Sequence, residues 1–213
     1  MVGTDWITWM RNPPLASHFG GVWERQIRTA RSILASLLQT HSTSLTGEGL
    51  RTLIVEVEGV INSRPLTVES LSDVNSLIPI APVNLLTRKS RVILPPPGDF
   101  QRADMFCRRQ WRRIQHVTNE FWIRWRKEFL NSLQQRTKWQ IKKRNFEKGD
   151  VVILRETSQR NDWKLARVTS CKVGQDGNVR SVILKTTSGQ ELERPINKLV
   201  LLVEAESDSP PRE

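Results

Sequence analysis

Residues 146–156, FEKGDVVILRE, mark the point where the sequence changes from a helical period to short runs of β-forming residues. Four aliphatic residues, Val151 to Leu154, follow the turn dipeptide Gly149-Asp150, a pattern typical of a buried strand after a tight turn. Similar runs, separated by turn residues, occupy residues 163–172, 179–185, 190–193 and 199–203. Five short strands this close together predict a small antiparallel β-barrel over residues 146–203.

The predicted barrel also needs a core. Val179, Val182 and Leu184 alternate along one run, and we expect them to form that core together with Trp163. The sequence after the last run, residues 204–213, is acidic, polar and proline-bearing, so we expect a disordered tail there.

The segment before the barrel has the period of a helix. Its apolar residues recur mostly at 3 or 4 positions between Ala103 and about Ile141: Cys107, Trp111, Ile114, Phe121, Trp125, Phe129 and Leu133. No proline or glycine interrupts this pattern, so it fits either one long helix or a tight helical pair. We assign residues 101–145 as a basic, tryptophan-rich helical connector.

Two further amphipathic helices are predicted near the start of the chain. The first carries Trp23, Ile27, Ala30, Leu34 and Leu37 on one face. The second begins after the N-cap candidate Thr46, ends before Pro65, and carries Leu50, Leu53, Ile54, Val57 and Ile61. Three successive prolines then make residues 87–100 an extended linker. The predicted fold class is therefore α+β.

The charge is concentrated in one segment. The 213 residues carry 33 Lys and Arg against 22 Asp and Glu, a formal net charge of +11, and residues 99–145 alone hold 13 basic and 4 acidic side chains. Such an excess favours a polyanionic partner, with nucleic acid first and a ribosomal or membrane surface as the alternative.

Within this segment, CRRQWRRIQ and FWIRWRKEF interleave arginine with tryptophan. Arginine pairs with phosphate while neighbouring aromatic rings pack or stack, so the pattern is typical of nucleic-acid binding. A purely structural explanation, with the tryptophans in a core and the arginines on a solvated face, remains open. The candidate DNA contacts are Arg108, Arg109, Arg112, Arg113, Arg124, Arg126 and Lys127.

Several other classes of protein receive no support. Cys107 and Cys171 lie far apart without a CxxC partner, and the three histidines share no metal-ligand spacing, so we expect neither a disulfide framework nor a zinc site. There is no P-loop, no GxGxxG and no signature of a small-molecule substrate. No apolar stretch is long enough to cross a membrane, and the protein is expected to be nuclear or cytoplasmic.

Glu24 stands at the start of the first predicted helix. A carboxylate there stabilises the positive end of the helix dipole by about 0.3 to 1 kcal/mol. Alternatively, Glu24, Arg28 and Arg31 share one helical stripe, which places a metal-capable oxygen beside two phosphate-capable guanidinium groups. Two-metal chemistry needs several carboxylates, however, and one is not enough.

Three motifs of the first half resemble the end of the integrase core of BEL/Pao (Pao) LTR retrotransposons: NPPLASHFGGVWERQIRTARSIL, LRTLIVEVEGVINSRPLT and LIPIAPVNLLTRKS. The sequence that follows, from FCRRQWRRIQHVTNEFWIRWRKEF to ERPINKLVLL, resembles the carboxy-terminal domain of unknown function that comes after this core. The resemblance covers residues 6–203. It implies that residues 1–86 are a helical remnant of a ribonuclease H-like core and that the barrel is similar to Src-homology-like barrels.

The resemblance also assigns roles to residues. It makes Glu24 the third member of an Asp-Asp-Glu triad that holds two Mg²⁺ ions, and it places Arg28 and Arg31 on the helix that contacts the DNA end. The two aspartates belong farther upstream than the 23 residues before Glu24 allow. We therefore expect a truncated integrase fragment that holds no cofactor, is not an enzyme and binds DNA. The alternative is a non-enzymatic interaction or oligomerisation module.

Overall fold

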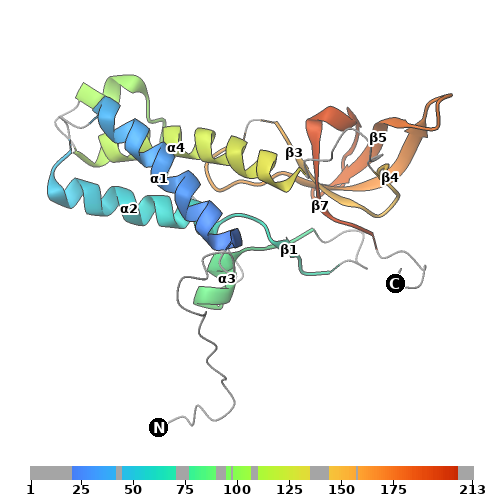
Figure 1. Ribbon diagram of the computed structural model, residues 1–213, viewed down its shortest axis with the longest axis horizontal. Helices are drawn as coiled ribbons and strands as arrows, with labels where there is room; N and C mark the ends of the chain where they lie inside the picture. The colour runs from blue at the N-terminus through green and yellow to red at the C-terminus, as the bar shows by residue number, and fades with distance from the viewer. Residues whose placement is uncertain are drawn as a thin grey trace, which may run out of the picture. The chain divides into compact units, whose positions relative to one another are not determined.

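The computed structural model describes residues 21–41, 45–70, 77–89, 95–96, 98–106, 110–134, 144–156 and 158–205 (Figure 1). The chain divides into two compact units, Met1–Ser42 and Thr43–Glu213, which are described separately below. The architecture is mixed α+β, as the sequence predicts. The expected disordered tail, the middle of the linker and the end of the connector lie wholly or largely outside the described residues.

The first unit contains the helix α1 (Gly21–His41), at the position that the apolar period predicts. Glu24 lies in its first turn. A carboxylate at this end of a helix interacts favourably with the unpaired N–H groups of the first turn. The prediction of an N-terminal helix that begins close to Glu24 is confirmed.

The second unit begins with α2 (Gly47–Asn62). The Oγ1 atom of Thr46 accepts a hydrogen bond of 3.2 Å from the backbone N–H of Gly49, which confirms Thr46 as the N-cap. The expected buried stripe was partly wrong. Leu53 and Val57 are buried, but Ile54 is 50% exposed, because the buried face of α2 is rotated toward the side that carries Gly49, Leu53, Val57 and Val60.

A short hairpin follows, formed by β1 (Thr67–Val68) and β2 (Pro79–Ile80). The short helix α3 (Pro82–Thr87) comes next, and the 3₁₀ helix η3 (Arg102–Phe106) precedes the long helix α4 (Gln110–Leu133). The connector is thus a 3₁₀ turn and one α-helix within the residues that the structure describes. Helix α4 packs against α2 and buries Ile114, Val117, Phe121, Trp122, Trp125 and Phe129.

The remaining elements form an antiparallel five-stranded sheet in the order β6-β5-β4-β3-β7. Its strands are β3 (Val151–Leu154), β4 (Leu165–Val173), β5 (Val179–Thr186), β6 (Glu191–Pro195) and β7 (Leu199–Val203), with the 3₁₀ helix η4 (Ile196–Lys198) between the last two. All five predicted strands are present. Val179, Val182 and Leu184 lie in the core of the sheet, as expected.

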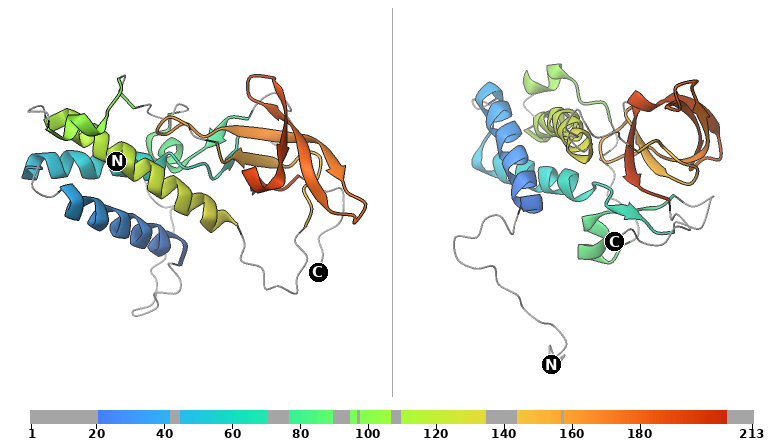
Figure 2. Two further views of the ribbon diagram at one scale, coloured as in Figure 1. Left: turned by 90° about the horizontal axis from the view of Figure 1, so that it is seen from above. Right: turned by 45° about the vertical axis from the view of Figure 1, so that its right-hand side comes forward.

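The prediction of a closed barrel was wrong. The sheet curls, as Figure 2 shows, but in the described residues β6 and β7 are its two edges and do not pair with each other. Pro195 ends β6 and has no N–H group to extend a ladder, and η4 then leads the chain away to pair β7 with β3 at the opposite edge. The result is a curved open sheet.

Trp163 is buried, but it does not lie in the core of the sheet. Its ring packs edge-to-face on three aromatic rings of α4, with centroid separations of 4.9 Å to Trp122, 6.1 Å to Trp125 and 5.4 Å to Phe129. Edge-to-face pairs of this kind stabilise a contact beyond the area they bury. The aromatic face of the connector therefore serves to fasten α4 to the segment that leads into β4.

Candidate nucleic-acid interface

The candidate contacts Arg124 and Lys127 lie on the exposed face of α4. They are one helical turn apart and opposite the aromatic face that packs on Trp163. Asn131 is exposed one turn further along, and its Oδ1 atom accepts weak hydrogen bonds of 3.5 and 3.4 Å from the guanidinium group of Arg155. The exposed basic face of α4 thus continues onto the end of β3.

Arg126 was predicted to contact DNA, but the structure places it inside the protein. It is 9% exposed, and its Nη2 atom donates to the carbonyl oxygens of Leu154 at 2.8 Å and Glu156 at 2.7 Å. Its guanidinium carbon lies 5.8 Å from the ring centroid of Trp163. Burial lowers the pKa of Arg126, since the protein solvates the cation less well than water does. This guanidinium group is therefore unable to reach a phosphate.

Arg112 is engaged by acidic and aromatic partners. Its Nε atom lies 2.7 Å from a carboxylate oxygen of Asp104, its Nη2 atom donates to the carbonyl oxygen of Asp99 at 3.2 Å, and its guanidinium group stacks on Phe100. The hydrogen bond from Arg112 is the main reason that the pKa of Asp104 is lowered. Much of the Arg112 charge is thus balanced within the protein.

The other connector candidates are placed as follows. Arg113 is half-buried near the start of α4. Arg108 and Arg109 lie outside the described residues, as does Cys107. Cys171 is a free cysteine whose sulfur donates to the carbonyl oxygen of Phe146.

A polar network that the sequence reasoning missed joins α2, α4 and the loop before β4. Arg160 is buried, and its Nη2 atom donates to the Oε1 atom of Gln115 and lies 3.4 Å from Oε2 of Glu56. Gln115 in turn donates to Oε1 of Glu56 at 2.9 Å. Burial lowers the pKa of Arg160, and the Glu56 carboxylate partly opposes this effect. The three residues are far apart in sequence, so no local pattern could have revealed them.

In the first unit, α1 carries Glu24, Arg28 and Arg31 on one face, with Glu24 half-buried and both arginines exposed. Among the residues that the structure describes, no group of three or more His, Cys, Asp or Glu side chains is arranged to hold a metal ion. A two-Mg²⁺ centre needs more oxygen ligands than Glu24 provides.

Comparison with known proteins adds one match. Residues 109–202 match the model of a family of unknown function (DUF5641), which is the part of the chain that contains α4 and the five-stranded sheet. No curated protein and no solved structure matches the chain. None of the described helices is both long and apolar enough to cross a membrane.

Proposed function

We propose that the chain is a DNA-binding protein derived from the integrase of a BEL/Pao retrotransposon. One observation carries this proposal: the exposed face of α4 presents Arg124 and Lys127 and continues through Asn131 to Arg155. This face of α4 lies in residues 99–145, the segment that holds most of the net positive charge of the chain. Basic side chains along one exposed face release counterions when they bind phosphates, and this release provides affinity that does not depend on sequence.

The origin of the fold is part of the same proposal. We assign α1 and α2 as the last helices of a ribonuclease H-like core, and the curled sheet as a Src-homology-like module. The support is the order of the motifs in the sequence, together with five short antiparallel strands after a long basic helix. In this assignment Arg28 and Arg31 of α1 contact DNA as well, since both are exposed on the face that carries Glu24.

The test is fluorescence anisotropy of a labelled DNA duplex titrated with the 213-residue chain at two salt concentrations. Binding should be tight at low salt and weaken steeply at high salt. The double variant R124Q/K127Q should weaken binding, and the matched control R88Q/K89Q removes the same charges from exposed positions after α3. Absence of binding at low salt, or equal losses in both double variants, would refute the proposal.

A second candidate is a protein-interaction or oligomerisation module. It is favoured by exposed apolar side chains in the second unit, with Leu85 67% and Leu86 72% exposed on α3 and Val55 66% exposed on α2. Such surfaces mark contacts between proteins when they gather in one patch. Association through them should persist at high salt, which separates this candidate from phosphate binding.

We also propose that these 213 residues do not catalyse strand transfer by themselves. The triad implied by the resemblance needs two aspartates that have no counterpart before Glu24, and paired metal ions depend on all three acids. A strand-transfer assay in Mg²⁺ or Mn²⁺ should show no product. Product that disappears in Glu24→Gln would contradict this.

A further inference from the structure

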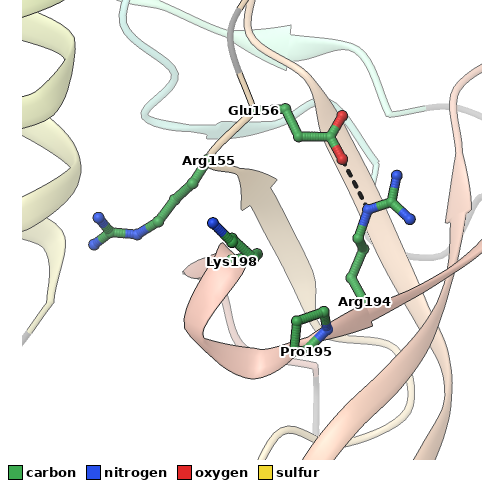
Figure 3. Close-up of a pocket in the computed structure, with 5 residues that line it drawn as sticks. All are labelled: Arg155, Glu156, Arg194, Pro195 and Lys198. Atoms are coloured by element: carbon green, nitrogen blue, oxygen red, sulfur yellow. Dashed lines mark hydrogen bonds and ion pairs between the residues drawn. The ribbon is translucent and has the colours of Figure 1, made fainter.

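A pocket of about 420 Å³ lies where the ends of β3 and β6 meet η4 (Figure 3). Its lining residues come from three places in the chain: Arg155 and Glu156 directly follow β3, Arg194 and Pro195 end β6, and Lys198 ends η4. The backbone N–H of Arg155 donates to the carbonyl oxygen of Lys198 at 2.9 Å, which holds two of these segments together. The pocket is therefore formed by the fold and not by a single loop.

The pocket is electropositive. It is lined by three cationic side chains and one carboxylate, that of Glu156, which accepts a hydrogen bond of 2.8 Å from Nε of Arg194. Lys164 approaches the same carboxylate only to 4.0 Å. Among the described residues, neither Arg155 nor Lys198 forms an ion pair. The guanidinium group of Arg155 meets the neutral amide of Asn131. Figure 3 shows Lys198 between the two arginines.

The pocket also continues the basic face of α4. Asn131, which contacts Arg155, lies one helical turn beyond Lys127 and two turns beyond Arg124. From Arg124 to Asn131 the helix rises by about 10 Å, which is the length of about three base-pair steps of DNA. Helix face and pocket together carry five cationic side chains against two carboxylates, those of the exposed Glu128 and of Glu156. This positive excess along one surface suits the regularly repeated charge of a nucleic-acid backbone better than an isolated acidic group.

From this geometry we infer that the pocket binds a backbone phosphate of the nucleic acid, as a second contact site on the sheet beside α4. The inference rests on the proposed function and extends it. Lys198 provides an ammonium group and Arg155 a guanidinium group for the phosphate oxygens, while Arg194 balances Glu156. The sequence alone did not indicate this site, because residues 146–213 contain 11 basic and 11 acidic side chains.

The test uses three single substitutions in the 213-residue chain, each measured by anisotropy with a labelled duplex over a range of salt. Lys198→Gln removes a pocket cation, and Glu156→Gln removes the pocket carboxylate but keeps an oxygen that Arg194 can donate to. The matched control is Lys148→Gln, an exposed lysine at the opposite end of β3. Melting temperatures of all three variants verify that they fold.

We expect Lys198→Gln to weaken binding by about tenfold at about 0.1 M salt and to lower the salt slope by about 1, because one counterion fewer is released. Glu156→Gln should strengthen binding, a change that a misfolded variant would not produce. Lys148→Gln should leave both quantities unchanged.

Other outcomes overturn the inference in distinguishable ways. If the unaltered chain fails to bind the duplex at low salt, the proposed function and this site both fail. If it binds, but the two pocket variants behave like Lys148→Gln, the site fails and the proposed function stands. If Lys198→Gln weakens binding of a poly-glutamate peptide but not of the duplex, the pocket serves an acidic protein partner instead.

Discussion

The Nη2 atom of Arg126 donates a 2.8 Å hydrogen bond to the carbonyl oxygen of Leu154, so an arginine of α4 is bound to the last residue of β3. Arg124, two positions earlier, is exposed on another face of the same helix. The two arginines belong to one basic run, FWIRWRKEF, yet one fastens the helix to the sheet and the other remains at the surface.

This difference in position predicts that two similar substitutions affect different properties, one the stability of the fold and the other DNA binding. Arg126→Ala removes charge-assisted hydrogen bonds to buried carbonyl groups and should lower the free energy of unfolding by about 2 to 4 kcal/mol. Arg124→Ala should change it by less than about 0.5 kcal/mol but weaken DNA binding. Urea denaturation measures the first quantity, and anisotropy of the folded variants measures the second. Equal stability of both variants would contradict the internal role of Arg126.

Trp163 provides a second stability test. Trp163→Ala removes a buried ring that packs on three aromatic residues of α4, and should cost about 3 to 5 kcal/mol. Trp111 is 46% exposed, so Trp111→Ala is a matched control that should cost less than about 1 kcal/mol. Thermal unfolding followed by circular dichroism compares the two. An unchanged melting temperature for Trp163→Ala would argue against the helix-to-sheet contact.

The network of Glu56, Gln115 and Arg160 can be tested through Glu56, its half-buried member. Glu56→Ala leaves the buried Arg160 with no carboxylate partner in the described residues, and should cost about 2 to 4 kcal/mol. Glu58, two positions later on α2, is exposed, and Glu58→Ala should cost less than about 0.5 kcal/mol. Urea denaturation measures both. Equal losses would mean that the network adds little to the docking of α2 on α4.

The lowered pKa of Asp176 leads to a prediction about the stability of the fold at low pH. Hydrogen bonds from Asn178, with a smaller contribution from Arg180, lower the pKa of Asp176 from 3.8 to about 2. Because the folded protein favours the carboxylate, this group stabilises the fold above the unfolded pKa of 3.8, and the contribution is lost as the pH falls toward 2. A carboxyl NMR titration should give a midpoint near 2, and Asn178→Ala should raise it toward 3.8. A midpoint of 3.8 in the unaltered protein would contradict the hydrogen bonds in this turn.

Local signals explain most of what the sequence predicted correctly. The strand at Val151–Leu154 follows a Gly-Asp turn, and the N-cap at Thr46 needs only a side-chain oxygen three residues before an amide N–H. The open sheet was missed because closure depends on whether two edges that are distant in sequence can pair. Pro195 and η4, which keep them apart, form no pattern that distinguishes an open sheet from a barrel.

For the candidate interface, too, some features follow from the sequence and others only from the tertiary structure. The sequence by itself determined where the positive charge lies and which segments are helical or extended, because composition and periodicity depend on neighbours along the chain. Only the tertiary structure decided that Arg126 is internal, that Arg160 is buried beside Glu56, and that Arg155 and Lys198 share a pocket. Burial and charge pairing depend on contacts between residues far apart in sequence, and the packing of α2, α4 and the strands against one another creates these contacts.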